Sequence, residues 1–482
     1  MTHRVAVVGA GVGGLATAIR LAIAGHDVTV VERNEQVGGK LSTFERDGFT
    51  FDIGPSLITM PHLLDEVFRL AGTTLDDEVD LVRLDPQFRY SWRDGSRLVV
   101  RDDHDAPAAE FDLFSQEGPA WREFDDHGRE IWDVAERTFF AGPMENPLDL
   151  LKRMESPKDL LAIDPLRTLR QAARSTFDDP RLHQWVGRYA TYSGSTPGRA
   201  PATLACIPHI EARYGCWYAM GGLGTLRDAF RRVAERVGVT VRTGLDVVSI
   251  TSTPDRVTGL AISDGSYVDA TIVVANADAR HVYDDLLPDE AALSKVRRAE
   301  RSTSGFALCI GVRGSTEEIG HHNVWFSDDG MQEFREIEAG LLASDPTIYG
   351  CVSSVTDPSQ APEGDENWFL LVNTPPGVEV DTESYRDVVL DRLASHGVDL
   401  RRRMRFCAHL SPTDIERLYR SPGGAIYGSS SNGMRAAFSR PRNRGAKDGL
   451  YLVGGSSHPG GGLPLVTTSA RIVADMIADD IA

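Results

Sequence analysis

A glycine pattern near the start of the chain constrains its fold more than any other feature. The spacing G-x-G-x-x-G is formed by Gly9, Gly11 and Gly14, with Gly13 between the last two. The apolar run 4–8 precedes it, and residues 15–24 have the composition of a helix. A second apolar run, 27–31, ends at Glu32. Strand, glycine turn, helix, strand and acid in this order are typical of a βαβ unit that binds a dinucleotide.

Each part of this pattern has a physical task. Gly9 permits the tight turn, Gly11 lets the backbone approach a pyrophosphate, and Gly14 lets helix and strand pack closely. Free N–H groups at the start of the helix attract phosphate oxygens. Glu32 can accept hydrogen bonds from both ribose hydroxyls. The alternative is a glycine-rich turn with a purely structural task, and the complete order of elements favours the dinucleotide site.

Length and charge limit the classes of protein to which the chain can belong. A chain of 482 residues is too long for one ordinary core, so two connected domains are expected. The net charge of −19 argues against nucleic-acid binding and against basic docking on anionic lipid. No apolar stretch reaches the roughly 18 residues of a spanning helix, and no leader-like segment precedes the first strand. We therefore expect a cytoplasmic protein, soluble or attached to the membrane periphery; the sequence carries no signal for an oligomeric state.

Cysteine and histidine positions give no disulfide or metal pattern. The five cysteines are irregularly spaced and none forms a C-x-x-C pair, so buried reduced thiols are expected. His321 and His322 are adjacent, and adjacent side chains in a strand face opposite sides of a sheet. We therefore predict no metal site.

A second glycine-rich turn lies near the end of the chain. The apolar run 449–453 leads into the turn 454–464, and residues 465–482 are expected to form a helix. Strand, turn and helix again direct backbone N–H groups at one point, where they could stabilise negative charge on a bound ring. The alternative is a terminal helix that only packs against the core. His458 is the one titratable residue of this turn; it could accept a proton, but bracing of the turn is the preferred interpretation.

Seven stretches along the chain carry a family resemblance: VGAGVGGLATAIRLAIAGHDVTVVERNEQVGGK, FDIGPSLITMP, DDPRLHQWVGRYATYSGSTPGRAPA, YGCWYAMGGLGTL, IVVANADA, SVTDPSQAPEG and LYLVGGSSHPGGGLP. Together they resemble the phytoene desaturase (bacterial carotenoid desaturase) family of FAD proteins. This family is related to the amine oxidases and the Rab GDP-dissociation inhibitors. The resemblance covers essentially the whole chain and implies FAD as the cofactor.

The resemblance also implies an α/β fold. A Rossmann-like FAD-binding domain of the glutathione-reductase and amine-oxidase type is expected from the discontinuous ranges 1–80, 205–290 and 430–482. An inserted α+β substrate domain is expected from 81–204 and 291–429, with a helical part at about 115–192.

The resemblance also implies roles for individual residues. The residues expected around the ADP half are Gly9, Gly11, Gly13, Gly14, Glu32, Gly39, Lys40 and, through its backbone, Val247. Those expected around the flavin ring are Gly54, Pro55, Gly455, Leu463, Pro464, Leu465 and Val466.

The resemblance implies an oxidoreductase that desaturates a carotenoid-like apolar polyene by hydride transfer to flavin. The stretch HPGGG-P resembles members that act late in carotenoid pathways, at 3,4-bonds or at terminal methyl groups. A flavin oxidase of an amine or another natural product, and a non-catalytic prenyl carrier, are the alternatives. The intact glycines and Glu32 weigh against a carrier, which has no need of contacts to ADP.

Overall fold

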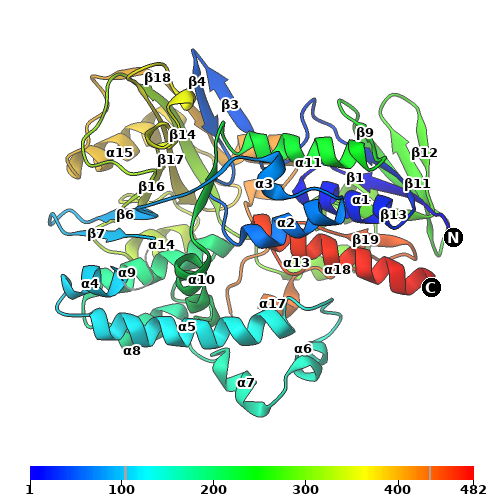
Figure 1. Ribbon diagram of the computed structural model, residues 1–482, viewed down its shortest axis with the longest axis horizontal. Helices are drawn as coiled ribbons and strands as arrows, with labels where there is room; N and C mark the ends of the chain where they lie inside the picture. Colours follow the sequence, from blue (N-terminus) through cyan, green and yellow to red (C-terminus); the bar gives the residue numbers. More distant parts are fainter. Residues whose placement is uncertain (103–105, 434–435) are drawn as a thin grey trace.

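The computed structural model describes residues 1–102, 106–433 and 436–482. Residues 103–105 and 434–435, which belong to the predicted ranges 81–204 and 430–482, lie outside the described part. Two large sheets lie toward opposite ends of the molecule, and both chain termini lie at the end that carries the parallel sheet (Figure 1).

The parallel sheet has the strand order β19-β13-β1-β2-β9. All of its neighbouring pairs are parallel. Its strands are β1 (Arg4–Val8), β2 (Asp27–Val31), β9 (Thr240–Arg242), β13 (Ile272–Ala275) and β19 (Leu450–Leu452). The chain therefore contributes to this sheet at its start, in its middle and at its end.

Both faces of the parallel sheet are covered, which explains why its strands are continuously apolar. Val5 and Val7 face a core shared with α1 (Val12–Ile23), α11 (Gly224–Arg236) and α18 (Leu463–Ile481). Ala6 and Val8 face the opposite side, because successive side chains of a strand alternate. There they pack against a three-stranded antiparallel sheet made of β10 (Val247–Ser252), β11 (Val257–Ile262) and β12 (Tyr267–Asp269).

Two helices begin earlier than the sequence pattern predicts. Helix α1 starts at Val12 and not at residue 15, so Gly14 lies in its first turn. Helix α18 starts at Leu463 and not at residue 465, so Pro464 also lies in a first turn. A proline is favourable there, because the N–H that it lacks has no partner within the helix.

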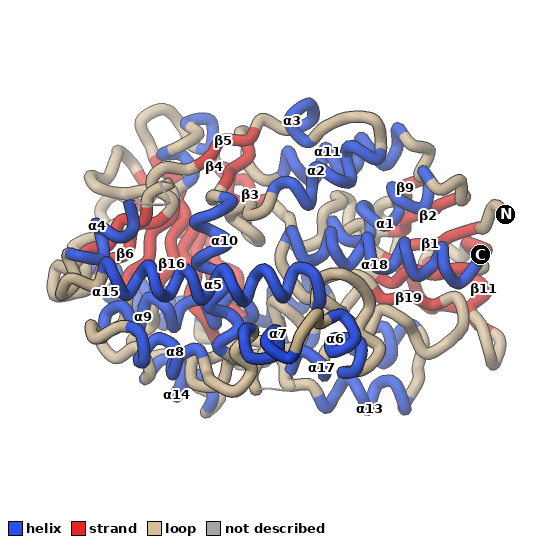
Figure 2. The backbone as a smooth tube through the Cα atoms, turned by 60° about the horizontal axis from the view of Figure 1, so that its bottom comes forward, coloured by secondary structure: helices blue, strands red, loops and turns tan. Residues whose placement is uncertain are grey.

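The second large sheet is mixed and has the order β18-β14-β17-β16-β15-β6-β7. Its strands are β6 (Phe88–Ser91), β7 (Arg97–Val100), β14 (Ser304–Val312), β15 (His322–Trp325), β16 (Ile348–Cys351), β17 (Glu366–Thr374) and β18 (Met404–Leu410). A layer of helices lies along one side of it, and α5 is the longest element of that layer (Figure 2). The helices of this region are α4 (Ala106–Asp112), α5 (Gly118–Thr138), α6 (Pro147–Arg153), α7 (Pro157–Ala162), α8 (Leu169–Thr176), α9 (Pro180–Arg188) and α10 (Cys206–Tyr214).

The remaining α-helices and strands of the described chain lie between or beside these sheets. They are β3 (Thr43–Arg46), β4 (Phe49–Asp52), β5 (Leu81–Arg83), β8 (Trp217–Ala219), α2 (Pro61–Leu70), α3 (Leu75–Glu78), α12 (Ala279–His281), α13 (Glu290–Arg298), α14 (Gln332–Glu338), α15 (Thr382–Ser395), α16 (Pro412–Tyr419) and α17 (Ala436–Ser439). None of the helices in the described ranges is both long and apolar enough to cross a membrane. The strands of the parallel sheet fall in the ranges 1–80, 205–290 and 430–482, and those of the mixed sheet in 81–204 and 291–429. The domain boundaries themselves stay a prediction.

Candidate functional site

The glycine turn between β1 and α1 is packed so closely that side chains are excluded. Gly9 has a φ of +89°, which favours glycine, and a Cβ on Gly14 would lie 2.3 Å from the carbonyl oxygen of Gly9. Gly11 is the N-cap of α1, and no side chain in the described ranges caps this helix. Its first N–H groups are therefore open to an anion. This cradle fits the diphosphate of a dinucleotide.

Asn276 contacts this turn from a neighbouring strand end, and the sequence analysis did not single it out. It follows β13, the strand beside β1, and its Nδ2 donates a 3.3 Å hydrogen bond to the carbonyl oxygen of Gly9. A Cβ on Gly11 would lie 2.7 Å from the same Nδ2. The available signal was a polar residue directly after a fully apolar strand, in IVVANADA.

Glu32 lies at the end of β2 and is almost completely buried. Its Oε2 accepts a 2.9 Å hydrogen bond from the N–H of Ala10, inside the glycine turn. Its Oε1 accepts from the backbone N–H and the side-chain amide of Asn34, both at 2.9 Å. Oε2 accepts only one of these bonds and has a second lone pair, so the group could still accept from a ribose. That contact stays a prediction.

The second glycine pair folds back onto the first. Gly38 forms a parallel bridge with Gly11, and a Cβ on Gly39 would lie 3.2 Å from the Cα of Gly11. Lys40 follows directly. Its ammonium group donates to the carbonyl oxygens of Ala425 and Ile426, and burial lowers its pKa to about 8. Lys40 therefore joins the nucleotide region to a loop of the large cavity described below.

Gly54 and Pro55 follow β4 and lie against the same region. A Cβ on Gly54 would lie 1.7 Å from the carbonyl oxygen of Lys40, so only glycine fits. Ser56 comes next, and its hydroxyl lies 2.5 Å from the hydroxyl of Tyr349 in β16. These three consecutive residues line the large cavity of the protein.

The C-terminal turn is held by a buried arginine that the sequence analysis also missed. Arg440 donates from Nη1 to the carbonyl oxygens of Gly455 and Tyr427, at 2.9 and 3.1 Å, and from Nη2 to that of Ser429 at 2.8 Å. Burial lowers the pKa of Arg440 to about 10. Residues 459–465 line the cavity, so Leu463, Pro464 and Leu465 reach it. Gly455, Val466 and Val247 are not among the lining residues.

His458 belongs to this turn but does not line the cavity. It is 1% exposed, its Nε2 lies 3.2 Å from the carbonyl oxygen of Gly142, and its ring packs edge-on against Phe139. Burial lowers its pKa to about 4, so the imidazole is neutral near pH 7. This placement favours the bracing interpretation over proton transfer.

A large, mostly apolar cavity lies between residues 54–56 and the C-terminal turn. Its volume is about 1050 Å³, and it extends from Gly54 and Gly460 at the nucleotide region to Leu160 and Ile163 in and beside α7. Leu160 is 41% exposed, so the cavity reaches the surface there. Its apolar lining includes Trp132, Phe139, Phe140, Ile207, Ile210 and Phe326.

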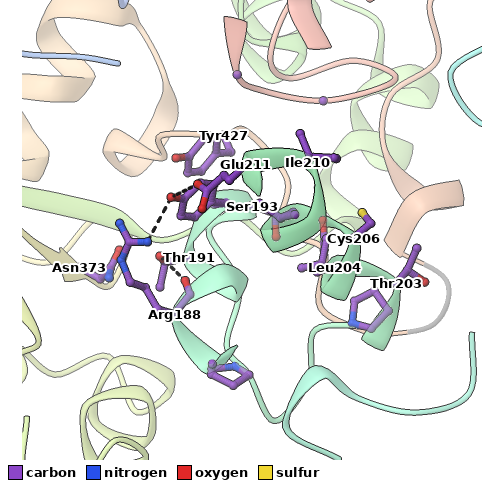
Figure 3. Close-up of a pocket in the computed structure, with 18 of the residues that line it drawn as sticks. Arg188, Thr191, Ser193, Thr203, Leu204, Cys206, Ile210, Glu211, Asn373 and Tyr427 are labelled. Atoms are coloured by element: carbon purple, nitrogen blue, oxygen red, sulfur yellow. Dashed lines mark hydrogen bonds between the residues drawn. The ribbon is translucent and has the colours of Figure 1, made fainter. Parts of the chain in front are cut away.

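One side of the cavity is polar. Figure 3 shows Arg188, Glu211, Asn373 and Tyr427 gathered there, with Leu204 and Cys206 on the other side. Nη1 of Arg188 donates a 3.1 Å hydrogen bond to the hydroxyl of Tyr192, which donates at 2.7 Å to Glu211.

The buried carboxyl of Glu211 has a second hydroxyl partner. Tyr189 donates to its other oxygen at 2.8 Å. Burial raises the pKa of Glu211, and Arg188 and the two tyrosine hydroxyls offset part of the rise.

Glu333, in α14, is a second buried carboxyl of the cavity wall. One of its oxygens accepts a 3.1 Å hydrogen bond from the N–H of Thr347, and the other has no hydrogen-bond partner in the described structure. Burial raises its pKa to about 7, although Thr347 and Asn373 oppose the shift.

The geometric reason for excluding a metal at His321 and His322 is wrong. Strand β15 begins at His322, so His321 lies outside the regular strand, and the two ring centroids are 4.5 Å apart. Their ligand atoms and that of Cys351 all lie within 4.8 Å of one another. Each Nδ1 already has a hydroxyl partner, Thr356 at 2.8 Å and Tyr349 at 2.9 Å.

Comparison with known proteins places this geometry in a family. Residues 12–478 match the family described as flavin containing amine oxidoreductase. The chain is 35% identical to 4,4′-diapolycopene oxygenase of Methylomonas sp, with 99% of each chain covered. It is 34% identical to 4,4′-diaponeurosporene oxygenase of Staphylococcus haemolyticus, with 98% of this chain and 97% of the relative covered.

Solved structures share the fold at low sequence identity. Putrescine oxidase with bound putrescine has a TM-score of 0.65 and 16% identity, covering 100% of this chain and 99% of that one. An oxidoreductase from Methanosarcina mazei has a TM-score of 0.66 and 17% identity, covering 99% and 100%. The predicted Rossmann-like α/β fold class is thereby confirmed.

Proposed function

Because the chain belongs to the flavin containing amine oxidoreductase family and uses FAD, we propose that it oxidises the terminal methyl group of an acyclic carotenoid-like polyene. The overall reaction is R–CH₃ + O₂ → R–CHO + H₂O, in which dioxygen takes up four electrons. Two relatives named as oxygenases of such polyenes support it, since each aligns with this chain from end to end.

The observation that carries the proposal is the mostly apolar cavity that reaches residues 54–56 and the C-terminal turn. An elongated hydrocarbon would enter at α7 and extend toward Gly54 and Gly460. Trp132, Phe139 and Phe326 would exclude water from it and hold it by apolar contact alone. Bound FAD supplies the two-electron acceptor; the chain itself orients the polyene.

Desaturation of an internal bond is the second candidate, and the same cavity would accept its substrate. The relatives favour the first candidate over a desaturation, because both are named as oxygenases. The products differ in composition, so one experiment separates the two reactions.

The test is expression in a host that accumulates an acyclic carotenoid, followed by mass analysis of the extracted pigments. Gain of one oxygen with loss of two hydrogens per modified end is expected. Loss of two hydrogens without oxygen would identify a desaturase. Unchanged pigment, together with oxidation of amines by the purified protein, would overturn the proposal.

We also propose that α6 and α7 dock the cavity entrance on a membrane surface. Leu148, Leu151, Leu160, Leu161 and Leu166 are 41–76% exposed within this short region. The two helices project from the body of the molecule (Figure 1), and Leu160 also lines the cavity. Side chains of this kind can insert into the interface without basic neighbours, which suits a chain of net charge −19.

A further inference from the structure

Arg188 places spare hydrogen-bond donors on the polar side of a mostly apolar cavity. Protein surrounds its side chain, and the surface that remains accessible faces the cavity. A guanidinium has five N–H donors, and the described structure gives this one a single hydrogen bond, to Tyr192. No carboxylate in the described ranges lies close enough for an ion pair with it.

Four aromatic rings keep the guanidinium in place. Its central carbon lies 4.8 Å from the ring centroid of Phe88, 5.1 Å from that of Tyr192, and 5.7 Å from those of Tyr90 and Tyr349. Such stacking holds a cation but leaves the edge of the guanidinium without acceptors. Unpaired donors in a water-poor site are costly, so an oxygen atom of a ligand would be bound strongly here.

Arg188 lies between the two loops of the cofactor region. Tyr349, one of its stacking partners, reaches Ser56 directly after Gly54 and Pro55. On the other side, burial raises the pKa of Tyr427 and Arg188 partly offsets the rise, so these two groups are close. The ring of Tyr427 lies against the C-terminal turn, since a Cβ on Gly461 would lie 2.8 Å from it. The spare donors are therefore at the reactive end of the cavity and not at its entrance.

The charge balance selects the kind of oxygen. Glu211 is joined to Arg188 through the hydroxyl of Tyr192, so the pair is close to neutral when Glu211 is ionised. A carboxylate ligand would add a second negative charge beside Glu211, which is unfavourable in a buried site. A carbonyl oxygen accepts the same hydrogen bonds without that cost.

Resting on the proposed function, we propose that Arg188 holds the carbonyl oxygen of an oxidised polyene end. The cavity then binds polyene aldehydes in preference to the parent hydrocarbons, and Arg188 is a positioning residue that fixes the oxidised end beside the cofactor loops. The polyene chain fills the apolar remainder of the cavity in both ligands.

The test is equilibrium binding to the FAD-loaded protein without turnover, with 4,4′-diapolycopene and its terminal aldehyde as the probes. The wild type should bind the aldehyde about tenfold to a hundredfold more tightly than the hydrocarbon. It should also move the aldehyde's absorption band to longer wavelength, because the carbonyl accepts hydrogen bonds from a cation. Arg188→Met should bind both probes equally, without the band shift.

Two further variants keep the result interpretable. Arg174→Met removes an exposed arginine from the wall of the same cavity and should keep both the preference and the band shift. Should Arg188→Met fail to fold, the double variant Arg188→Met/Glu211→Gln removes both buried charges together. Equal binding of the two probes by the wild type would overturn the inference. An undiminished preference of Arg188→Met for the aldehyde would overturn it as well. Failure of the proposed function would be seen separately, as hydrocarbon left unoxidised by the wild type.

Discussion

Glu32 and Ala10 are joined across the glycine turn, where Oε2 of Glu32 accepts a 2.9 Å hydrogen bond from the backbone N–H of Ala10. The acid at the end of β2 therefore helps to shape the turn. The same carboxylate is the predicted acceptor for the ribose, so its two tasks are coupled.

Replacing Glu32 by Gln should weaken FAD binding roughly tenfold or more, since an amide offers one acceptor oxygen where the carboxylate offers two. The measurement is the dissociation constant of FAD, from flavin fluorescence on titration of the apoprotein. Glu45→Gln, an exposed position on β3, is the matched control and should bind FAD as the wild type does. Unchanged affinity in Glu32→Gln would contradict a role for this residue in the nucleotide site.

Glu333 should make stability depend on pH. Its pKa of about 7 lies above the ordinary value of 4.5, so the folded protein retains a proton that the unfolded chain has released. The stabilisation is complete below about pH 4.5 and is lost as the pH rises through 7. Glu333→Gln should therefore match the wild type near pH 5 and exceed its unfolding free energy near pH 8, by on the order of 2–3 kcal/mol.

Chemical denaturation at both pH values measures this difference. Glu317→Gln, at an exposed position, should leave the pH dependence as in the wild type. A difference between Glu333→Gln and the wild type that is the same at pH 5 and pH 8 would show that Glu333 does not titrate in this range.

His458 should matter for stability and little for chemistry. His458→Gln keeps a donor for the carbonyl oxygen of Gly142 but loses the ring packed on Phe139. We expect a melting temperature lower by a few degrees and a turnover number within about threefold of the wild type. A hundredfold loss of turnover with full FAD content would instead assign the imidazole a chemical role.

The exposed leucines of α6, α7 and the following residues should control membrane binding. Leu148→Ser/Leu161→Ser/Leu166→Ser removes three of them and should weaken binding to phosphatidylcholine vesicles at least tenfold, by loss of apolar contact with the lipid. Cosedimentation with vesicles is the measurement, and Leu341→Ser, an exposed leucine in the loop after α14, is the control. Equal binding of the triple variant and the wild type would rule out this surface.

Local patterns predicted much of the fold. The run 4–8, the glycine spacing and the run 27–31 are each continuous in sequence, and they form β1, the turn and β2 as expected. The predicted start of α1 was too late because glycine is a poor helix former. Gly13 and Gly14 are helical because Asn276 and the end of β1 lie so close to them that a side chain would not fit.

Residues that act through distant partners could not be predicted. Arg440 holds carbonyl groups at 427, 429 and 455, and Arg188 meets Glu211 through Tyr192. Nothing in the neighbouring sequence marks such side chains, because their partners are brought together only by the fold. The geometric argument about His321 and His322 was wrong for a related reason. Side chains alternate between the two faces of a sheet only within a regular strand, and His321 lies outside β15.

The most direct test of the account is to incubate the purified, FAD-loaded protein with 4,4′-diapolycopene in air. The molecular mass of the product is then determined by mass spectrometry. The account predicts a product that has gained one oxygen and lost two hydrogens, and that carries an aldehyde. Recovery of unchanged polyene from protein with a full complement of FAD, or of a product that has lost hydrogen only, would contradict it.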